Sequence, residues 1–407
     1  MADRALPLAG VRVLDCSRVL AGPFATMVLA DLGADVVKLE PPAGDESRDW
    51  GPPFWGDPAE RISAYFAVVN RNKRSIAADL RTDGGRELLD LLASRSDLLV
   101  HNARPASAER LGLGADRLAE RHPDLVVAVV GGFAIAGQGA ERPAYDLLAQ
   151  AVTGLMAVTG EPSGAPMKVG VALLDLLAGL EVAVGALAGL LAAERRAGRL
   201  GQGSRIDDVR GSRIDVALVE VGVSSLINVL GNLVATGEEP MRHGNAHPNI
   251  VPYEVFATAD GHVAIAVGND RQFARLISTL NLGADERFET NAGRVAHRAE
   301  LITFLAGAIA ARGRDELVGA LIGADVPAGQ VNRVSEALAM MQATAGDAWL
   351  QEAGQTRLAP NPIWVNRERL PVREAPPRLG EHTDAVLSEV GLDADQIDHL
   401  RASGVVA

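Results

Sequence analysis

The chain has 407 residues, of which 48% are apolar and 22% are charged, a composition typical of a globular protein with two or three domains. Its formal net charge of −13 argues against nucleic acid or an anionic membrane as the main partner. The single cysteine, Cys16, cannot form an intrachain disulfide, and the first residues lack the apolar segment of a signal peptide. We therefore expect a cytoplasmic protein.

Residues 11–40 have the pattern of a βαβ unit. The strand VRVLD is followed by a loop, a helix that ends near Gly33 and the strand ADVVKLE. Two parallel strands joined by a helix imply a sheet that is covered on both faces. The loop after the first strand lies at the ligand-binding edge of such a sheet, so residues 18–22 are candidates for ligand contact. The chain has no G-x-G-x-x-G motif in this loop and no P-loop motif.

Polar and basic residues gather beside two of the next predicted strands. They are Asn70, Arg71, Lys73 and Arg74 in NRNKRSIAADL, and Asn102, Arg104 and Arg110 after DLLVHN. In an acidic protein such groups suit phosphate binding, although a solvated basic turn has the same composition. Strand and helix alternate over the first 155 residues, which predicts a doubly wound α/β fold.

A strongly apolar helix is expected from about Val169 to Arg196, and only two acids, Asp175 and Glu181, interrupt its first turns. The N-terminus of a helix stabilises an ionised carboxylate, so Asp175 has the setting of a carboxylate nucleophile. Two simpler interpretations stay open, a helix N-terminal charge and one half of a buried ion pair. A membrane span is disfavoured, because both acids would then lie in lipid.

The second half of the chain predicts a smaller α+β domain. The sequence GSRID occurs at 203–207 and again at 211–215, which we interpret as a lengthened linker, followed by an apolar helical stretch over 216–236. YEVFATAD and HVAIAVG flank the turn at Asp260–Gly261 and predict a hairpin. Helices are expected at 270–280, 294–311, 314–323 and 335–345, a strand at 362–366, and a last helix capped by Asp393.

The order and spacing of several segments resemble the class III CoA-transferases, the family of formyl-CoA transferase, carnitine CoA-transferase and the 2-methylacyl-CoA racemases. The segments are LAGVRVLDCSRVLAGPFATMVLADLGADVVKLEPP, NRNKRSIAADL, HNARPASAERLG, ERPAYDLLAQAVTGLMAVTGEP, GVALLDLLAG, GNAHPNIVPYEVFATADGHVAIAVGNDRQF, VPAGQVN and LGEHTDAVL. The resemblance implies a Rossmann-like large domain from both ends of the chain, an inserted small domain and an interlocked homodimer. It assigns 1–197 and 333–407 to the large domain with a linker, 198–222 to another linker, and 223–332 to the small domain.

The resemblance also implies chemistry: the carboxylate of Asp175 attacks an acyl-CoA, and CoA is a substrate, with no permanently bound cofactor and no metal. Arg18, Val19, Leu20 and Ala21 would line the CoA cleft. Lys73, Arg74, Asn102, Ala103, Arg104 and Arg110 would hold its phosphates and adenine. Phe133, Tyr145 and Asp146 would lie at the pantetheine end.

Alternative functions remain at this point. A racemase needs an acid and a base on opposite faces of a carbon, and the family's racemases have a histidine where this chain has Tyr145. Because an unperturbed tyrosine is a poor base near neutral pH, we favour transfer over racemisation. A catalytically silent CoA-binding protein is a third possibility. The segments GNAHPNIVPYEVF and GNDRQF resemble members that use dicarboxylic acids with succinyl-CoA as donor, and Arg242, His247 and Arg271 are candidates for binding the second carboxylate.

Overall fold

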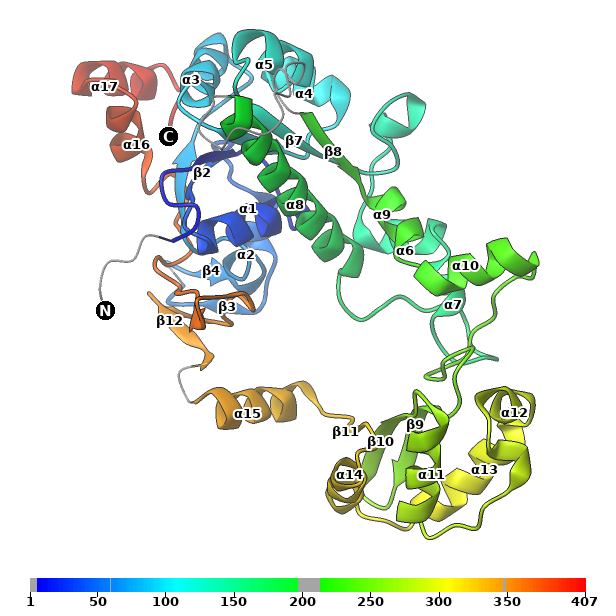
Figure 1. The fold of residues 1–407 in the computed structure, drawn as a ribbon. Helices are drawn as coiled ribbons and strands as arrows, with labels where there is room; N and C mark the ends of the chain where they lie inside the picture. The colour runs from blue at the N-terminus through cyan, green and yellow to red at the C-terminus, as the bar shows by residue number, and fades with distance from the viewer. Residues whose placement is uncertain (1–5, 59, 197–212, 347–348) are drawn as a thin grey trace. The chain divides into compact units, whose positions relative to one another are not determined.

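The structure is a computed structural model that describes residues 6–58, 60–196, 213–346 and 349–407. The chain divides into two compact units, a larger one with residues 1–154, 169–227 and 347–407 and a smaller one with residues 155–168 and 228–346. Figure 1 traces the chain through both units. Each unit has its own hydrophobic core.

The larger unit is built on a six-stranded sheet in which every neighbouring pair is parallel, in the order β5-β2-β1-β6-β7-β8. The strands are β1 (Arg12–Asp15), β2 (Asp35–Glu40), β5 (Lys73–Ala77), β6 (Leu98–His101), β7 (Val126–Gly131) and β8 (Arg213–Ala217). The chain winds outward from β1 in one direction and then from β6 in the other. This is the doubly wound order, and it leaves a crevice at the carboxyl ends of β1 and β6. The α/β prediction is confirmed.

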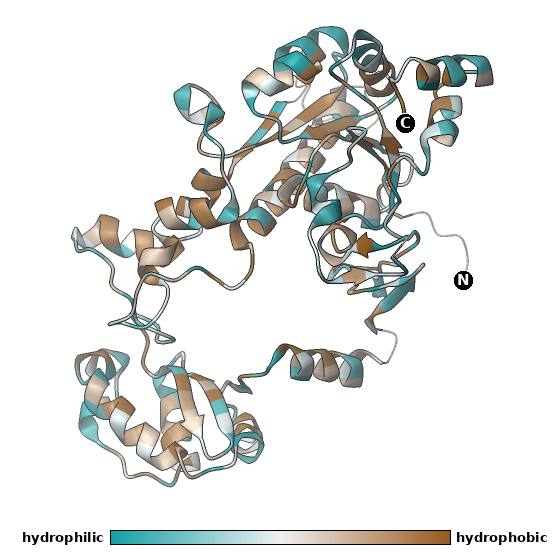
Figure 2. Cartoon of the chain, turned by 180° about the vertical axis from the view of Figure 1, so that it is seen from behind, coloured by the Kyte–Doolittle hydropathy of each residue, from teal (hydrophilic) through white to brown (hydrophobic). Residues whose placement is uncertain are grey.

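Helices cover both faces of this sheet. One face packs against α3 (Asp83–Ala93), α4 (Pro105–Leu111), α5 (Ala115–Arg121), α16 (Thr383–Glu389) and α17 (Ala394–Ala402), through a core that includes Leu14, Leu99 and Val127. The other face carries α1 (Ala21–Asp31) and α8 (Leu173–Arg196), which lie side by side (Figure 1). Figure 2 shows that the strands between these layers are predominantly hydrophobic, as expected for parallel strands buried on both faces.

Helix α8 begins at Leu173, four residues later than the sequence predicts. Residues 169–172 instead form a short non-helical segment that is held by α6 (Asp146–Val152), because the Gln150 side chain accepts a hydrogen bond from the Val169 N–H at 2.8 Å. The buried residues Leu174, Ala178, Val182 and Ala186 recur every four positions and form the stripe of α8 that packs against the rest of the larger unit.

By length and composition α8 could cross a membrane, and so could the bent pair α9 (Leu218–Ser224) and α10 (Ile227–Thr236) taken as one span.

The predicted linker 198–222 is wrong at its end, where residues 213–217 form β8 and residues 218–224 form α9. The second GSRID copy therefore contributes the start of a sheet strand, which pairs with β7 in the register Ala128↔Ile214. Ile214 of this copy belongs to the packing between the sheet and α8, because its side chain lies directly against Gly185 of α8. The first copy lies outside the described residues.

Short elements complete the larger unit. They are η1 (Glu46–Asp49), β3 (Phe54–Trp55), β4 (Ile62–Ser63), α2 (Ala64–Ala67), η2 (Gln138–Glu141), α6 (Asp146–Val152), β12 (Gln351–Ala353), β13 (Thr356–Leu358), β14 (Trp364–Val365) and β15 (Glu368–Arg369). The predicted capping of the last helix is confirmed: Asp393 accepts a hydrogen bond from the N–H of Gln396, which bonds back to Asp393.

The smaller unit has an antiparallel sheet in the order β11-β10-β9 with helices packed on it. Its elements are α7 (Leu155–Val158), α10, β9 (Tyr253–Thr258), β10 (Gly261–Ala266), α11 (Asp270–Thr279), η3 (Glu286–Phe288), α12 (Asn291–Ala296), α13 (Arg298–Ile309), α14 (Arg314–Gly323), β11 (Ala328–Gln330) and α15 (Val334–Ala345). The hairpin of β9 and β10 is confirmed, with Gly261 opposite Thr258. Unlike the expected 223–332, this unit includes 155–168, because the Arg242 guanidinium donates to the carbonyls of Ala157 and Glu161.

Candidate active site

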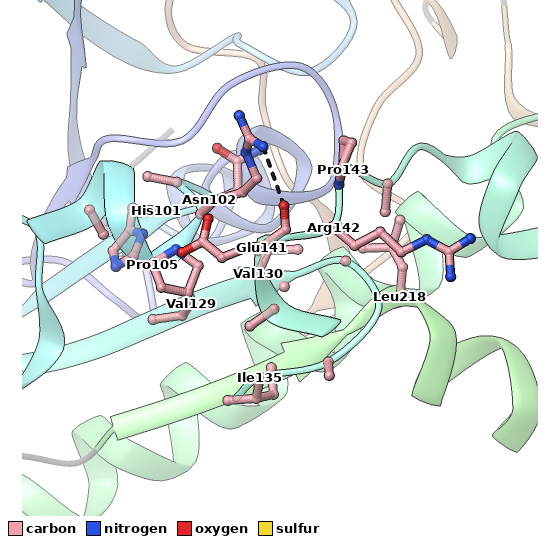
Figure 3. A pocket seen from close by; sticks show the side chains of 18 of the residues that line it. His101, Asn102, Pro105, Val129, Val130, Ile135, Glu141, Arg142, Pro143 and Leu218 are labelled. Atoms are coloured by element: carbon pink, nitrogen blue, oxygen red, sulfur yellow. Dashed lines mark hydrogen bonds between the residues drawn. The ribbon is translucent and has the colours of Figure 1, made fainter. Parts of the chain in front are cut away.

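A cavity of about 600 Å³ opens at the carboxyl ends of β1, β6 and β7. Its walls come from the loop after β1 (18–21), the end of β6 with the start of α4 (101–105), and the end of β7 with the long segment that follows it (129–145). Asp175 and Leu218 also line it. Figure 3 shows side chains from the end of β6, the start of α4, β7 and the segment that follows it, together with Leu218, around the cavity. The cavity therefore lies where a doubly wound sheet binds ligands, next to the reversal of strand order.

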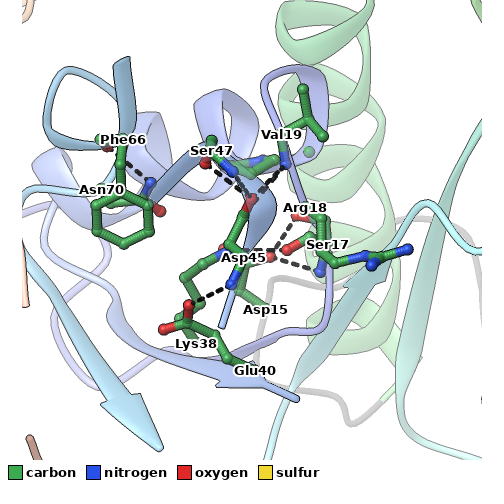
Figure 4. Close-up of polar contacts among 12 residues, drawn as sticks. Asp15, Ser17, Arg18, Val19, Lys38, Glu40, Asp45, Ser47, Phe66 and Asn70 are labelled. Carbon is green, nitrogen blue, oxygen red and sulfur yellow. Dashed lines mark hydrogen bonds and ion pairs between the residues drawn. The ribbon is translucent and has the colours of Figure 1, made fainter. Parts of the chain in front are cut away.

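The loop after β1 is held from both sides. The Asn102 amide accepts a hydrogen bond from the Arg18 N–H at 3.0 Å and donates to the Arg18 carbonyl at 2.7 Å. The Asp45 carboxylate accepts from the Val19 N–H at 3.1 Å (Figure 4). Val19 has a φ of 73°, which is unfavourable for a β-branched residue. These bonds fix Arg18, Val19, Leu20 and Ala21 along the cavity wall, where the sequence predicts them.

A buried network of charges lies beneath this loop, and it contains Lys73. The Lys73 ammonium lies 3.0 Å from Asp15, and the Lys38 ammonium lies 3.0 Å from Asp45, with all four side chains shielded from solvent. Burial lowers the pKa of Lys73 to about 8, although Asp15 acts in the opposite direction. Lys73 does not line the cavity, which corrects its assignment to CoA phosphates. It stabilises Asp15 and thereby the end of β1.

Arg74 is also placed differently from the prediction. Its guanidinium pairs with Asp35 at 2.7 Å and with Glu389 at 2.8 Å, so it joins β5, β2 and α16. Lys73 and Arg74 are the first two residues of β5, whereas the cavity lies at the carboxyl ends of the strands. The basic residues Lys73 and Arg74 therefore lie at the opposite edge of the sheet from the cavity in which CoA was expected.

Arginines do occur at the cavity, from other segments. Arg18, Arg104 and Arg142 all line it, and Arg104 donates to the Glu141 carbonyl at 3.3 Å. Arg142 was not predicted; its guanidinium stacks 3.7 Å from the ring centre of Phe133. Asn102 and Ala103 also line the cavity, whereas Arg110 and Phe133 do not. Arg110 is exposed and bonds Ser107.

Asp175 lies in the first turn of α8 and lines the cavity. Burial raises its pKa to about 7, and the neighbouring Asp146 acts in the same direction. The helix N-terminus favours the ionised form, but here burial and Asp146 outweigh it. The carboxylate is thus only partly solvated, which increases its nucleophilicity when ionised.

Asp146 organises the start of α8 and does not line the cavity. Its carboxylate accepts hydrogen bonds from the Leu174 N–H at 2.8 Å and from Gln150 at 2.7 Å. It therefore satisfies one of the free N–H groups at the N-terminus of α8. Tyr145 precedes it, is 51% exposed, and lines the cavity as expected.

Sequence reasoning missed two residues of this region, Tyr65 and Asp45. Tyr65 lies close enough to Asp175 that, together with burial as the larger cause, this acid raises the pKa of the phenol to about 12. Asp45 fixes Val19, as described above. Asp45 belongs to the irregular segment 41–57 and Tyr65 follows it, and no local sequence pattern there indicates which residues they contact.

The residues predicted to bind the second carboxylate of a dicarboxylic acid lie in the smaller unit. Arg242 is bonded to backbone carbonyls, His247 accepts a hydrogen bond from the Asn249 N–H, and Arg271 is exposed.

The fold and the cavity define a doubly wound α/β protein in which a partly buried carboxylate, Asp175, lines an arginine-lined cavity. The chain matches the model of CoA-transferase family III over residues 8–383. It is 39% identical over 400 residues to the succinate–glutarate CoA-transferase of Agrobacterium fabrum, covering 96% of this chain and 97% of that protein. It is 35% identical over 413 residues to the human succinyl-CoA:glutarate CoA-transferase, covering 98% and 90%.

A solved structure agrees with these relationships. A CAIB/BAIF family protein from Brucella suis superposes with a TM-score of 0.82 at 38% identity, covering 95% of this chain and 100% of that one. The chain therefore belongs to CoA-transferase family III, and it is an enzyme.

Proposed function

We propose that this enzyme transfers CoA from succinyl-CoA to a second, free dicarboxylic acid, with Asp175 as the covalent nucleophile. The observation that carries the proposal is the Asp175 carboxylate, partly buried in the first turn of α8 and lining the same cavity as Arg18, Arg104 and Arg142. Arginines suit the phosphates of CoA. The substrate class is supported by the names of the relatives, which include succinate–glutarate and succinyl-CoA:mesaconate CoA-transferases.

The proposed reaction has four exchanges at one carboxylate. Asp175 attacks the thioester carbonyl of succinyl-CoA, the C–S bond breaks, and an aspartyl–succinyl anhydride and CoA thiolate form. The thiolate attacks the aspartyl carbonyl, which releases succinate and leaves an aspartyl-CoA thioester. The acceptor carboxylate displaces CoA thiolate to give a second anhydride, and the thiolate attacks its acyl carbon to release the new acyl-CoA and Asp175. Backbone N–H groups of the Gly131–Gly137 segment, which lines the cavity, are candidates for stabilising the oxyanions.

Transfer can be tested by following new acyl-CoA with chromatography. The wild type is mixed with succinyl-CoA and either glutarate, mesaconate, malate or acetate. We expect product with one or more of the dicarboxylates, and a loss of at least about 10³-fold in Asp175→Asn, because the amide is no nucleophile. Glu181→Gln is the matched control, since Glu181 is the other acid in the first turns of α8, is exposed and does not line the cavity. Equal activity in Asp175→Asn would contradict the assignment. Exchange of the α-proton of a 2-methylacyl-CoA in deuterated water, without transfer, would favour the racemase alternative.

We also propose that the enzyme is an interlocked homodimer located in the cytoplasm. Apolar side chains remain uncovered on two helices of the larger unit: Val184 of α8 is 64% exposed and Leu147 of α6 is 53% exposed, and Leu148, Leu180 and Leu191 are also exposed. Apolar surface of this kind is typical of an interface between subunits. Light scattering after gel filtration should give twice the chain mass of 42.6 kDa, and a monomer would contradict the dimer.

A further inference from the structure

Gln150 of α6 is fully buried, and its side chain makes three hydrogen bonds within the part of the chain that the structure describes. The amide oxygen accepts from the Val169 N–H at 2.8 Å. The amide nitrogen donates to the Asp146 carboxylate at 2.7 Å and to the Val171 carbonyl at 3.4 Å. In this orientation every contact joins a donor to an acceptor. Because a buried amide is costly unless both of its ends are bonded, these partners fix the side chain.

The bond to the Val169 N–H lies where the chain returns to the larger unit. Residues 155–168 belong to the smaller unit, and Val169 is the first residue after them in the larger unit. The Arg242 guanidinium binds that segment by donating to two of its backbone carbonyls at 3.0 and 3.3 Å. Asp175 follows shortly afterwards, in the first turn of α8. Gln150 therefore holds the chain at its entry into the larger unit, just before the helix that carries Asp175.

Gln150 and Asp146 hold the start of α8 together. They lie four positions apart on α6, so their side chains share one face of that helix. Gln150 bonds the backbone of Val169 and Val171, which precede α8. Asp146 accepts from the Leu174 N–H at 2.8 Å, at the beginning of α8. Since the Gln150 amide also orients the Asp146 carboxylate, the loss of one side chain loosens the contacts of both.

We propose that Gln150 is a positioning residue for the nucleophile: it fixes the first turn of α8 and, through Asp146, the charge next to Asp175. This inference rests on the proposed function, because it takes Asp175 as the reacting carboxylate. Gln150 does not line the cavity, so its effect on the reaction passes through these hydrogen bonds. A displacement of about 1 Å can slow a reacting group ~10²-fold. Loss of Gln150 therefore lowers the rate of acyl exchange and leaves the affinity for CoA unchanged.

The first test replaces Gln150 by a side chain of similar size that makes no such hydrogen bonds. In Gln150→Met we expect kcat to fall about 10- to 100-fold, with the KM for succinyl-CoA within about threefold of the wild type. Gln351→Met is the matched control, because Gln351 of β12 accepts from the Val372 N–H at 2.6 Å, donates to the Leu370 carbonyl at 3.4 Å and does not line the cavity. It should leave kcat unchanged. An unchanged kcat in Gln150→Met, or a rise in KM alone, would overturn the inference.

A second variant separates positioning from packing and does not depend on the folding of Gln150→Met. The carboxyl group of Gln150→Glu keeps an acceptor for the Val169 N–H and, while it is protonated, a donor to Asp146. Burial and the facing carboxylate disfavour its ionisation, so it should be protonated near about pH 6 and ionise as the pH rises to about 9.

The kcat of Gln150→Glu is divided by that of the wild type at each pH, with both rates counted per folded chain from circular dichroism. We expect this ratio to be within about threefold of one near pH 6 and to fall with rising pH, because the ionised carboxyl no longer donates to Asp146. A ratio that does not change with pH would overturn the inference. Failure of the proposed function is distinguishable, because the wild type would then transfer no CoA between acids, or Asp175→Asn would remain active.

Discussion

Asp175, the nucleophile that we propose, has Asp146 as its neighbour, and the charge of Asp146 helps to raise the pKa of Asp175. Asp146 accepts a hydrogen bond from the Leu174 N–H, so its charge is held at the N-terminus of α8 beside Asp175. Burial first, and then this charge, raise the pKa of Asp175 to about 7. An attacking carboxylate must be ionised, so kcat/KM for succinyl-CoA should rise about tenfold per pH unit below pH 7 and level off above it.

The variant Asp146→Asn tests this coupling. The amide oxygen can still accept from the Leu174 N–H, but the charge that raises the pKa of Asp175 is removed. We expect the acid limb of the kcat/KM profile to move to lower pH, while the plateau stays within about tenfold of the wild type. Asp116→Asn, which alters a carboxylate of the cavity wall, should leave the limb in place. A limb that moves to higher pH would contradict this account.

The same shift has a consequence for stability. The pKa of Asp175 is about 7 in the folded protein against 3.8 for the free group, so the folded state binds more protons between these values. Stability contributed by this group is therefore lost as the pH rises from about 4 to 7. Asp175→Asn should gain ~1–3 kcal/mol over the wild type at pH 8, less than the full shift because the side chain is partly solvated. Urea unfolding of both proteins at pH 5 and pH 8 measures this difference in the free energy of unfolding. A gain in Asp175→Asn that is smaller at pH 8 than at pH 5 would contradict the predicted direction.

At the scale of elements, the loop after β1 depends on one amide. Asn102 bonds both the N–H and the carbonyl of Arg18. Asn102→Ala removes both bonds and should raise the KM for succinyl-CoA about 5- to 20-fold, with a loss of ~1–2 kcal/mol in the free energy of unfolding. Ser107→Ala, which removes only a bond to the exposed Arg110, is the control. Steady-state kinetics measure the change in KM, and urea unfolding measures the change in stability. An unchanged KM would contradict the prediction, because the loop after β1 would then keep its shape without Asn102.

The contact between α1 and α8 depends on Gly179. A Cβ at this position would lie 2.6 Å from the Ala21 carbonyl oxygen, so the helices would have to separate. Gly179→Ala should destabilise the protein by ~1–3 kcal/mol and weaken CoA binding, because Ala21 also lines the cavity. Gly319→Ala in α14 is the matched control, since it meets nothing within 4 Å and should be neutral or slightly stabilising. Thermal unfolding of both variants measures the effect. A loss of stability in Gly179→Ala alone would show that the contact with α1 outweighs the better helix propensity of alanine, and equal stability of the two variants would contradict this.

For the whole molecule, the sequence predicts best what local pattern determines. The alternating strands, the hairpin at 253–266 and the cap at Asp393 are local, and the structure confirms them. The α/β class also follows from the repetition of strand and helix. Asp175 was singled out by a local conflict, an acid within an apolar helix, and the structure places it in the cavity.

What the sequence could not determine depends on which edge or face a residue occupies. Lys73 and Arg74 have the composition of a phosphate site, but they begin β5 and pair with carboxylates distant in the chain. Arg142 is isolated in the sequence and lies in the cavity because of the long segment after β7. The duplicated GSRID has the composition of a linker, but its second copy completes the edge of the sheet. Each error concerns a contact with a distant segment.

The central claim is that Asp175 carries the acyl group and CoA covalently. The most direct measurement is the mass of the intact protein after brief incubation with succinyl-CoA, with peptide mapping after trapping by hydroxylamine. We predict an adduct of the mass of bound CoA or a succinyl group, a hydroxamate at Asp175, and no adduct in Asp175→Asn. An enzyme that transfers CoA without any adduct, or with an adduct on another residue, would contradict the account.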